Sequence, residues 1–262
     1  MAFSPNAPSR RWLLATACAI VAGLTIGTIG TAMANQNADG GRVIVLINPN
    51  SNEAATQSMT GLAQIAAADA AVVEGRSNTG APALLTTPQD MAAAASGVVA
   101  IGREAAADPR VGAIIVSAFS DPGLAELRKA VDVPVFGIGE EVFHEAARDG
   151  RPFGIVTVTP DPALIESFRE KAASLGYEAQ YRGTRVTEGD PKVLVEQAEA
   201  LDAALAAAVT ESVAKDGASA VIMGGGPLSA SAVRLQPQFE APLLVAVHAA
   251  ARAAAKAITQ AQ

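Results

Sequence analysis

Residues 111–124 read VGAIIVSAFSDPGL, and this stretch decides the fold class. A continuous apolar run ends in small, polar and Gly/Pro residues, and the helix-forming segment LAELRKAV (124–131) follows it. Such a run is typical of a strand in a parallel sheet, because helices bury both faces of that sheet. Ligands of parallel α/β sheets bind beyond the carboxyl ends of the strands. The loop from Ser117 to Asp121 is therefore expected to line a site, although it contains no Cys, His or Lys.

The same pattern of an apolar segment followed by an Ala-rich helical stretch recurs from Arg42 onward. Strands that alternate with helices predict an α/β protein with parallel sheets. The eight predicted strands are RVIVLI (42–47), AVVEG (71–75), VGAIIVS (111–117), VPVFGI (133–138), PFGIVTV (152–158), YEAQYRG (177–183), ASAVIMG (218–224) and APLLVAV (241–247).

Three blocks of the first half recur in the same order in the second half. They align Pro49 with Pro160, Ala118 with Gly225 and Pro134 with Pro242, at offsets of 111, 107 and 108 residues. The nearly constant offset predicts two pseudo-symmetric lobes, each a parallel sheet flanked by helices, with a ligand cleft between them. We expect lobe 1 to span residues 42–137, with the C-terminal residues 241–262 packing back on it, and lobe 2 to span 138–240.

The first 34 residues are typical of a bacterial secretory signal. Arg10 and Arg11 precede an apolar stretch, and Ala32-Met33-Ala34 provides a small-x-small cleavage site. SRRWLL also resembles the twin-arginine signal, so the Sec and Tat routes both stay open. We expect a signal peptide (1–34), a polar linker (35–41) and a periplasmic or extracellular protein; the alternative is an uncleaved N-terminal anchor.

Charge and cysteine content narrow the range of partners. The net charge is −7, and it becomes −9 once Arg10 and Arg11 leave with the signal. Such a surface excludes nucleic acid as a partner, and leaves membrane contact only to the signal or anchor. Cys18, the single cysteine, lies in the signal, so the mature chain has no thiol. We expect no cofactor and no metal; homo-oligomerisation is left open.

Four loops at predicted strand ends should meet at the cleft: 48–52, 117–121, 157–161 and 224–228. Asparagine side chains beside a helix starting near Glu53, and glycines whose backbone N–H groups can surround an anion, suit a small carboxylate or ureide. The alternatives are that Asn50 or Ser51 only caps the helix, and that the glycines only form a turn. The predicted ligand-binding residues are Asn48, Pro49, Asn50, Ser51, Phe119, Ser120, Thr157, Thr159, Gly224 and Gly226.

His144 follows Glu140 by four residues, which places both side chains on one face of a helix. An imidazole beside a carboxylate can serve as a base, but a hydrogen-bonded pair on the helix surface is the alternative. We interpret His248 as structural. Two histidines without clustered carboxylates do not make a metal site.

Taken together, the loops resemble the aspartate/glutamate/hydantoin racemase superfamily, most closely its hydantoin and allantoin racemase branch. LINPNS (46–51) is similar to VINPNT of that branch, and AFSDPGL (118–124) to CFGDPGL. PVFGIGEEVFHEA (134–146) is similar to PVVGIGEAAMHAA, and IMGGGPL (222–228) to VLGCAGM. The resemblance covers residues 42 to about 258.

The resemblance implies a cofactor-independent racemase of two α/β lobes. Two cysteines, one from each lobe, would exchange a proton on opposite faces of one carbon, and the loops would hold the substrate oxygens. Here Ala118 and Gly225 occupy the two cysteine positions, and Val245 replaces an aspartate of the family's last strand. Neither Ala nor Gly can carry a proton.

Three interpretations follow. The first is an amino-acid or hydantoin racemase-like isomerase whose acid and base are other groups, with Ser117, Ser120, Glu140 and His144 as candidates. Asp121, which precedes Pro122, is a further candidate or only sets the turn. The second is a non-catalytic periplasmic protein that binds a small carboxylate, amino acid or ureide. The third is a structural remnant that binds nothing.

Overall fold

The computed structural model describes residues 42–85, 88–225 and 228–261. All described residues belong to one compact unit. The predicted signal peptide and the predicted linker lie outside the described residues. In the part of the chain that is described, no helix is long and apolar enough to cross a membrane.

The first lobe is a four-stranded parallel sheet in the order β2-β1-β3-β4. Its strands are β1 (Val43–Asn48), β2 (Val72–Ser77), β3 (Val111–Val116) and β4 (Val135–Gly137). Its helices are α1 (Glu53–Ala67), α2 (Pro88–Ala106) and α3 (Leu124–Ala130), with a 3₁₀ turn at Ala68–Ala70.

The second lobe repeats this sheet in the order β6-β5-β7-β8, again with all pairs parallel. Its strands are β5 (Phe153–Thr157), β6 (Tyr181–Val186), β7 (Ala220–Met223) and β8 (Leu243–Leu244). The helices after β4 are α4 (Ile138–Ala146), α5 (Pro162–Ser174), α6 (Pro191–Leu194), α7 (Ala198–Ala214), α8 (Leu228–Leu235) and α9 (Ala246–Gln260), with 3₁₀ turns at Arg148–Gly150 and Gln236–Gln238. The two equivalent strand orders confirm the prediction of two pseudo-symmetric α/β lobes.

Some predicted strands have other bounds in the structure. APLLVAV was predicted as extended to Val247, but β8 is only Leu243–Leu244, and Ala246 and Val247 already belong to α9. The sixth predicted strand begins later than expected. YEAQYRG was predicted as extended from residue 177, but β6 begins at Tyr181 and residues 177–180 form a turn. Gly176 adopts a positive φ of 80° after α5, and the Tyr177 amide donates to Ala172 O at 2.7 Å. The Tyr177 hydroxyl lies 2.8 Å from His144 Nδ1, so this residue is held by contacts to two helices.

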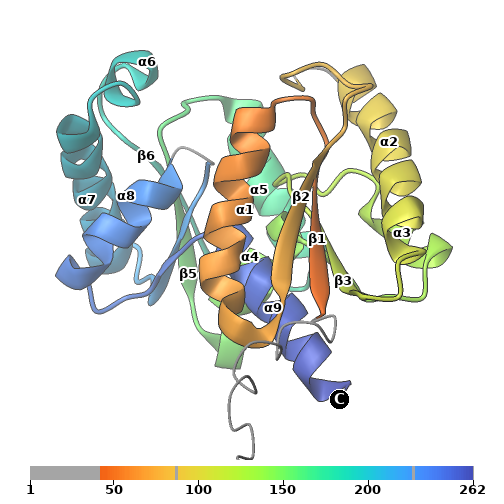
Figure 1. The fold of residues 1–262 in the computed structure, drawn as a ribbon. Coiled ribbons are helices and arrows are strands. Elements are labelled where there is room, and N and C mark those ends of the chain that lie inside the picture. The colour runs from red at the N-terminus through yellow and green to blue at the C-terminus, as the bar shows by residue number, and fades with distance from the viewer. Residues whose placement is uncertain (1–41, 86–87, 226–227, 262) are drawn as a thin grey trace, which may run out of the picture. The chain divides into compact units, whose positions relative to one another are not determined.

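The inner strands β1 and β3 are almost continuously apolar because both faces of the sheet are covered there (Figure 1), whereas the edge strand β2 carries Glu74 and Arg76. On β1, Val43, Val45 and Ile47 pack with residues of α2 and α3. Ile44 and Leu46, on the opposite face, pack with residues of α1 and α9. Period-two alternation therefore divides one continuous apolar segment between two helical layers.

The C-terminal segment contacts both sheets. β8 pairs with β7 in the second sheet, whereas α9 packs against α1, α4, β3 and β4. One apolar cluster includes Ile115 from the first sheet and Val156 from the second, so the core is continuous between the lobes.

Replacing Ile115 with alanine tests this shared core. Ile115 is fully buried, so Ile115→Ala is expected to lower the free energy of unfolding by about 2–5 kcal/mol. Urea denaturation measures the change. The matched control is Ile65→Ala, because Ile65 is 73% exposed and its truncation should change stability by about 0.5 kcal/mol or less. Equal losses in the two variants would contradict this description of the core.

Candidate functional site

A cavity of about 520 Å³, here called the central cavity, lies at the carboxyl ends of β1, β3 and β7. It is lined by residues of both lobes, as the paired loops predict. The described lining residues are Asn48, Asn50, Ala55, Ser58, Met59, Leu62, Leu84, Ser117, Ala118, Phe119, Ile138, Met223, Gly225, Ser229, Ala246 and Val247.

The first turns of four helices contribute to this lining: Ala55 from α1, Ile138 from α4, Ser229 from α8 and Ala246 from α9. The N-terminal end of a helix carries partial positive charge. The central cavity is thus suited to ligand oxygens that accept hydrogen bonds.

Ala118 and Gly225 both line the central cavity. The internal repeat pairs these positions, and the fold brings them to one space. Among the described lining residues there is no Cys, His, Lys, Arg, Asp or Glu. This part of the wall therefore contains no group that titrates near neutral pH.

The loop after β1 is held by its own hydrogen bonds. Asn48 Nδ2 donates to Thr56 Oγ1 at 3.0 Å and to Asn50 Oδ1 at 2.9 Å, and Asn48 Oδ1 accepts the Asn50 amide. Asn52, rather than Asn50 or Ser51, caps α1, because its Oδ1 accepts the Ala55 amide at 3.0 Å. Asn48 is thus a structural residue of the loop.

Asn50 has no hydrogen-bond acceptor among the described residues for its side-chain NH₂ group. Its Oδ1 accepts from Asn48 and from the Asn52 amide, whereas no described group accepts from its Nδ2. Pro49 and Ser51 stabilise the loop by backbone hydrogen bonds. Pro49 O accepts from Asn78 Nδ2, and the Ser51 amide donates to Pro82 O. Of this loop, the Asn50 amide is the best candidate to contact a ligand.

The two serines of the loop after β3 face thioethers. Ser117 Oγ lies 2.9 Å from Met59 Sδ, and Ser120 Oγ lies 3.6 Å from Met91 Sδ. No base is hydrogen-bonded to either hydroxyl in the described structure. A serine hydroxyl without a base is a weak nucleophile and a weak carbon base.

The second-lobe residues that were predicted to bind a ligand are not found in the described wall of the central cavity. Thr157 is buried and its Oγ1 accepts the Thr159 amide at 3.3 Å. The Gly224 amide donates to Val156 O at 2.8 Å. None of these three residues is among the described lining of the central cavity. Gly226 lies outside the described residues.

A second cavity of about 460 Å³, here called the side pocket, shares Asn50, Leu84, Ala118 and Phe119 with the central cavity. Its other described lining residues are Leu85, Met91, Ser120, Leu164, Ser167 and Lys171. Lys171 belongs to α5 of the second lobe.

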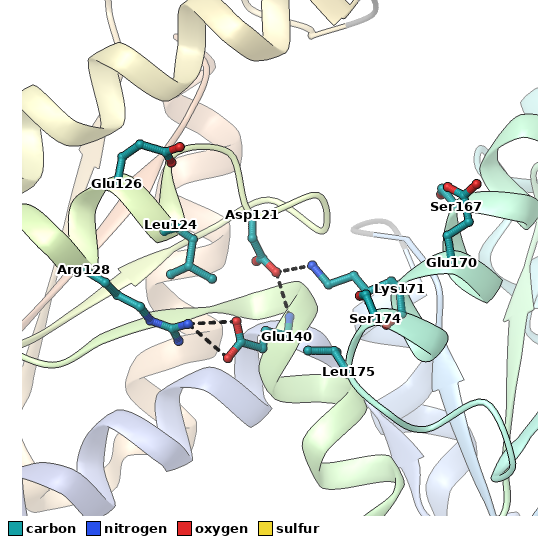
Figure 2. Close-up of a pocket in the computed structure, with 11 residues that line it drawn as sticks. Asp121, Leu124, Glu126, Arg128, Glu140, Ser167, Glu170, Lys171, Ser174 and Leu175 are labelled. Atoms are coloured by element: carbon teal, nitrogen blue, oxygen red, sulfur yellow. Dashed lines mark hydrogen bonds and ion pairs between the residues drawn. The ribbon is translucent and has the colours of Figure 1, made fainter.

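Asp121 is the charged partner of Lys171 and connects the two lobes (Figure 2). Its carboxylate also accepts the amides of Gly139 at 2.9 Å and Glu140 at 2.8 Å, at the start of α4. Burial raises the pKa of Asp121, while Lys171 and the two amides act in the opposite direction. Its φ of 52° is in the left-handed region, which Asp tolerates better than most residues.

Close packing explains the glycine of the GIGE segment. A Cβ added at Gly139 would lie 1.9 Å from Phe119 O and 2.8 Å from Asp121 Oδ2. Only a residue without a side chain lets the amide of α4 approach the Asp121 carboxylate. The interpretation of Asp121 as a turn residue alone is therefore incomplete.

Sequence reasoning missed Lys171. It is one of several charged residues in an ordinary amphipathic helix, and its partner is 50 residues away in the chain. No local sequence pattern predicts an ion pair between residues so far apart in the chain.

Glu140 and His144 form a network outside the central cavity. His144 Nε2 lies 3.3 Å from Glu140 Oε1, and Arg128 donates to both Glu140 oxygens at 3.0–3.1 Å. The hydrogen bond from His144, followed by those from Arg128, lowers the pKa of Glu140 to about 2. The hydrogen bond to Glu140 raises the pKa of His144. These residues are placed to support α4 rather than to reach a ligand beside Ala118.

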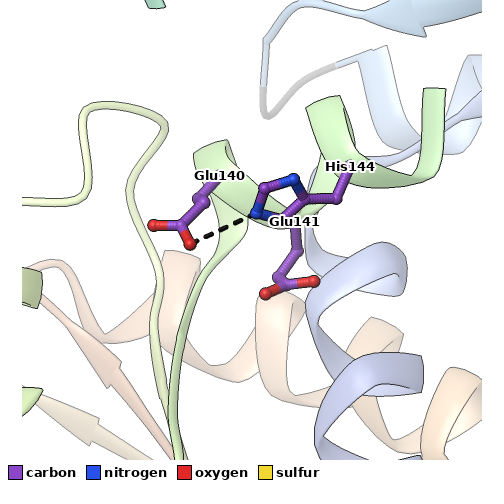
Figure 3. A group of neighbouring side chains, drawn as sticks. All are labelled: Glu140, Glu141 and His144. Carbon is purple, nitrogen blue, oxygen red and sulfur yellow. Dashed lines mark hydrogen bonds and ion pairs between the residues drawn. The ribbon is translucent and has the colours of Figure 1, made fainter. Parts of the chain in front are cut away.

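Glu141 completes a small cluster with this pair (Figure 3). One ligand atom each from Glu140, Glu141 and His144 lies within 4.8 Å of the others, so the inference that the chain has no clustered carboxylates is wrong here. Arg128 already neutralises Glu140, and a cation would compete with it. These are the residues that could hold a metal ion in the described structure.

His248 lies near the Arg252–Glu145 ion pair, and burial lowers its pKa. Its buried Nε2 has no hydrogen-bond partner among the described groups. It faces a different pocket from Ala118 and Gly225.

Comparisons with known proteins agree with this fold. A model of the Asp/Glu/Hydantoin racemase family matches residues 44–254. The hydantoin racemase of Paenarthrobacter aurescens is 26% identical over 211 residues, covering 80% of this chain and 89% of the relative. The hydantoin racemase of Rhizobium meliloti is 28% identical, covering 80% and 86%. The structure of allantoin racemase from Klebsiella pneumoniae superposes with a TM-score of 0.75 at 23% identity, covering 84% of this chain and 89% of that chain.

The Glu140 network predicts an acid-dependent loss of stability. The pKa of Glu140 is lowered from 4.5 to about 2, so its stabilising contribution is present above pH 4.5 and disappears as the pH falls toward 2. Relative to Glu140→Gln, the native protein should lose about 2 kcal/mol over this range, allowing for solvent screening. Urea denaturation from pH 6 to pH 2.5 measures the difference.

Glu141→Gln is the matched control on the same helix. Burial raises the pKa of Glu141, so its charged form opposes folding as the pH rises above 4.5. Glu141→Gln should therefore show the same acid-dependent loss of stability as the native protein. If both variants flatten the pH profile equally, the stabilisation assigned to Glu140 is wrong.

Proposed function

Because the chain belongs to the Asp/Glu/hydantoin racemase family, we propose that it uses the family's scaffold to bind a small ureide or related amide without two-thiol proton transfer. One observation carries the proposal. The central cavity is lined by Ala118 and Gly225, and its described wall contains neither a thiol nor a charged side chain.

Racemisation at a carbon centre needs a base on one face of that carbon and an acid on the other face, both close enough to exchange a proton with it. Cys18 is the chain's single cysteine, and it lies in the predicted signal. Ser117 directly precedes position 118 in the chain, but its hydroxyl contacts a thioether and no described base. The wall therefore supports binding better than proton abstraction.

The lining also argues for a neutral head group in the central cavity. A buried ammonium or carboxylate without an opposite charge is strongly disfavoured. Urea-type groups are neutral, and their polar atoms can pair with the Asn50 amide and with the hydroxyls of Ser58 and Ser229. Met59, Leu62, Met223 and other apolar residues are suited to the carbon skeleton. A free amino acid fits this part of the wall less well.

The relatives support ureides as candidate ligands. Two of them are named for hydantoin and one for allantoin, and both compounds are cyclic ureides. We also propose that the protein is exported, on the basis of Arg10-Arg11, the apolar stretch and the Ala32-Met33-Ala34 site.

Binding and proton exchange can be measured on the same compounds. At a ureide concentration about 100 times Kd, binding should stabilise the protein by about 2.7 kcal/mol and raise Tm by roughly 5–10 °C. Incorporation of solvent deuterium at the stereogenic carbon should not exceed that of the heat-inactivated protein. NMR detects the exchange.

Exchange above that control would favour an isomerase that uses other groups, with Ser117 as the first candidate in the cavity. Absence of both a Tm shift and exchange, over hydantoins, allantoin and amino acids, would favour a remnant without a ligand.

Restoring both thiols tests the position of the cavity. The double variant Ala118→Cys/Gly225→Cys should acquire measurable racemisation of a hydantoin, because each lobe then presents one thiol to the same space. The two single variants are matched controls and should remain without racemisation. Failure of a folded double variant would contradict the assignment of the central cavity as the substrate position.

A further inference from the structure

We propose that the side pocket is a carboxylate subsite built around Lys171, so that the two cavities together select a ureide that carries a carboxylate. This inference rests on the proposed function, because it requires the ureide group to occupy the central cavity. The chemical class is an open-chain ureido acid.

The two cavities lie next to each other and differ in the charge of their walls. They share Asn50, Leu84, Ala118 and Phe119. The described wall of the central cavity is uncharged, whereas Lys171 is the single charged residue in the described wall of the side pocket. A ligand that spans both cavities therefore meets a cation at one end only.

The ammonium of Lys171 keeps a donor for a ligand. A lysine ammonium has three N–H groups. One donates to Phe119 O at 3.3 Å and one to Asp121 Oδ2, and no described group accepts the third. The side chain is 20% exposed, so this remaining N–H is only partly solvated.

The position of Asp121 makes an anion in the side pocket acceptable. Asp121 lines a different opening, the outer crevice of Figure 2, and is not among the described lining of the side pocket. Lys171 lines both. Lys171 therefore lies between the outer crevice and the side pocket, and Asp121 and Phe119 hold its ammonium in position.

Asn50 supplies a second donor. Its free Nδ2 belongs to the shared wall, where the neutral and charged ends of a spanning ligand would meet. Ser167 does not add a donor, because its hydroxyl already donates to Leu164 O at 2.7 Å. Lys171 is thus the group on which discrimination between an acid and its neutral amide depends.

A matched pair of ligands tests the subsite. N-carbamoyl-leucine carries the carboxylate, and N-carbamoyl-leucinamide replaces it with a neutral amide. Calorimetric titration of the native protein should show the acid binding at least about 10-fold more tightly, as expected for a charge-assisted contact. In Lys171→Met this preference should fall to about threefold or less, while the affinity for the amide stays unchanged.

Lys215→Met is the control for removal of a lysine charge. Lys215 is also ion-paired, with Glu211, but it lies on the surface and lines neither cavity. It should retain the native preference for the acid.

Lys171→Met leaves Asp121 buried without its cation, which can prevent folding. The double variant Asp121→Asn/Lys171→Met removes both charges together and should fold while lacking the preference. Circular dichroism and urea denaturation verify folding of each variant before titration.

The outcomes separate the two proposals. If the amide binds but the native protein does not prefer the acid, or if the folded double variant keeps the preference, the subsite is overturned and binding of ureides stands. If neither compound nor any cyclic ureide binds the native protein, the proposed function fails, and the subsite fails with it.

Discussion

Asp121 brings together three segments that the chain order keeps apart. Its buried carboxylate accepts two amides from the start of α4 and pairs with Lys171 of α5. Because Asp121 itself follows β3, one side chain holds the loop that contains Ala118, a helix whose first residue lines the central cavity, and the second lobe. Removing one partner of such a buried pair usually destabilises a protein more than the pair stabilises it. The loop geometry therefore depends on all three contacts being made together.

This arrangement separates charge from the central cavity. The carboxylates and cations near the junction of the lobes, Glu140, Arg128, Asp121 and Lys171, neutralise one another. The described wall of the central cavity offers only neutral donors, acceptors and apolar surface. A cavity of this kind favours a ligand whose own polar groups are neutral where they are most deeply buried.

Much of the fold follows from local patterns, because buried strands leave an apolar signature and the two halves repeat it in the same order. The same reasoning paired Ala118 with Gly225, and the fold places both in one cavity. The partnership of Asp121 with Lys171 could not be predicted, because it depends on how α5 packs against a loop of the other lobe. The shift of β6 to Tyr181 has a similar cause, since a tertiary contact with His144 holds Tyr177 in a turn. Thr157 and Gly224 were predicted to bind a ligand because they lie at strand ends. In the structure, Thr157 Oγ1 and the Gly224 amide form hydrogen bonds with neighbouring backbone.

The cavity does not depend on thiols at positions 118 and 225. The loop after β1 is stabilised by Asn48, Thr56 and Ser77, and the loop after β3 by Asp121, none of which is a proton-transferring group in the cavity. Reactive side chains at positions 118 and 225 would contribute chemistry but little of this hydrogen bonding. With alanine and glycine there, the chain keeps the walls of the cavity and the helix ends that line it. The side-chain hydrogen bonds that shape the cavity are therefore made by residues other than Ala118 and Gly225.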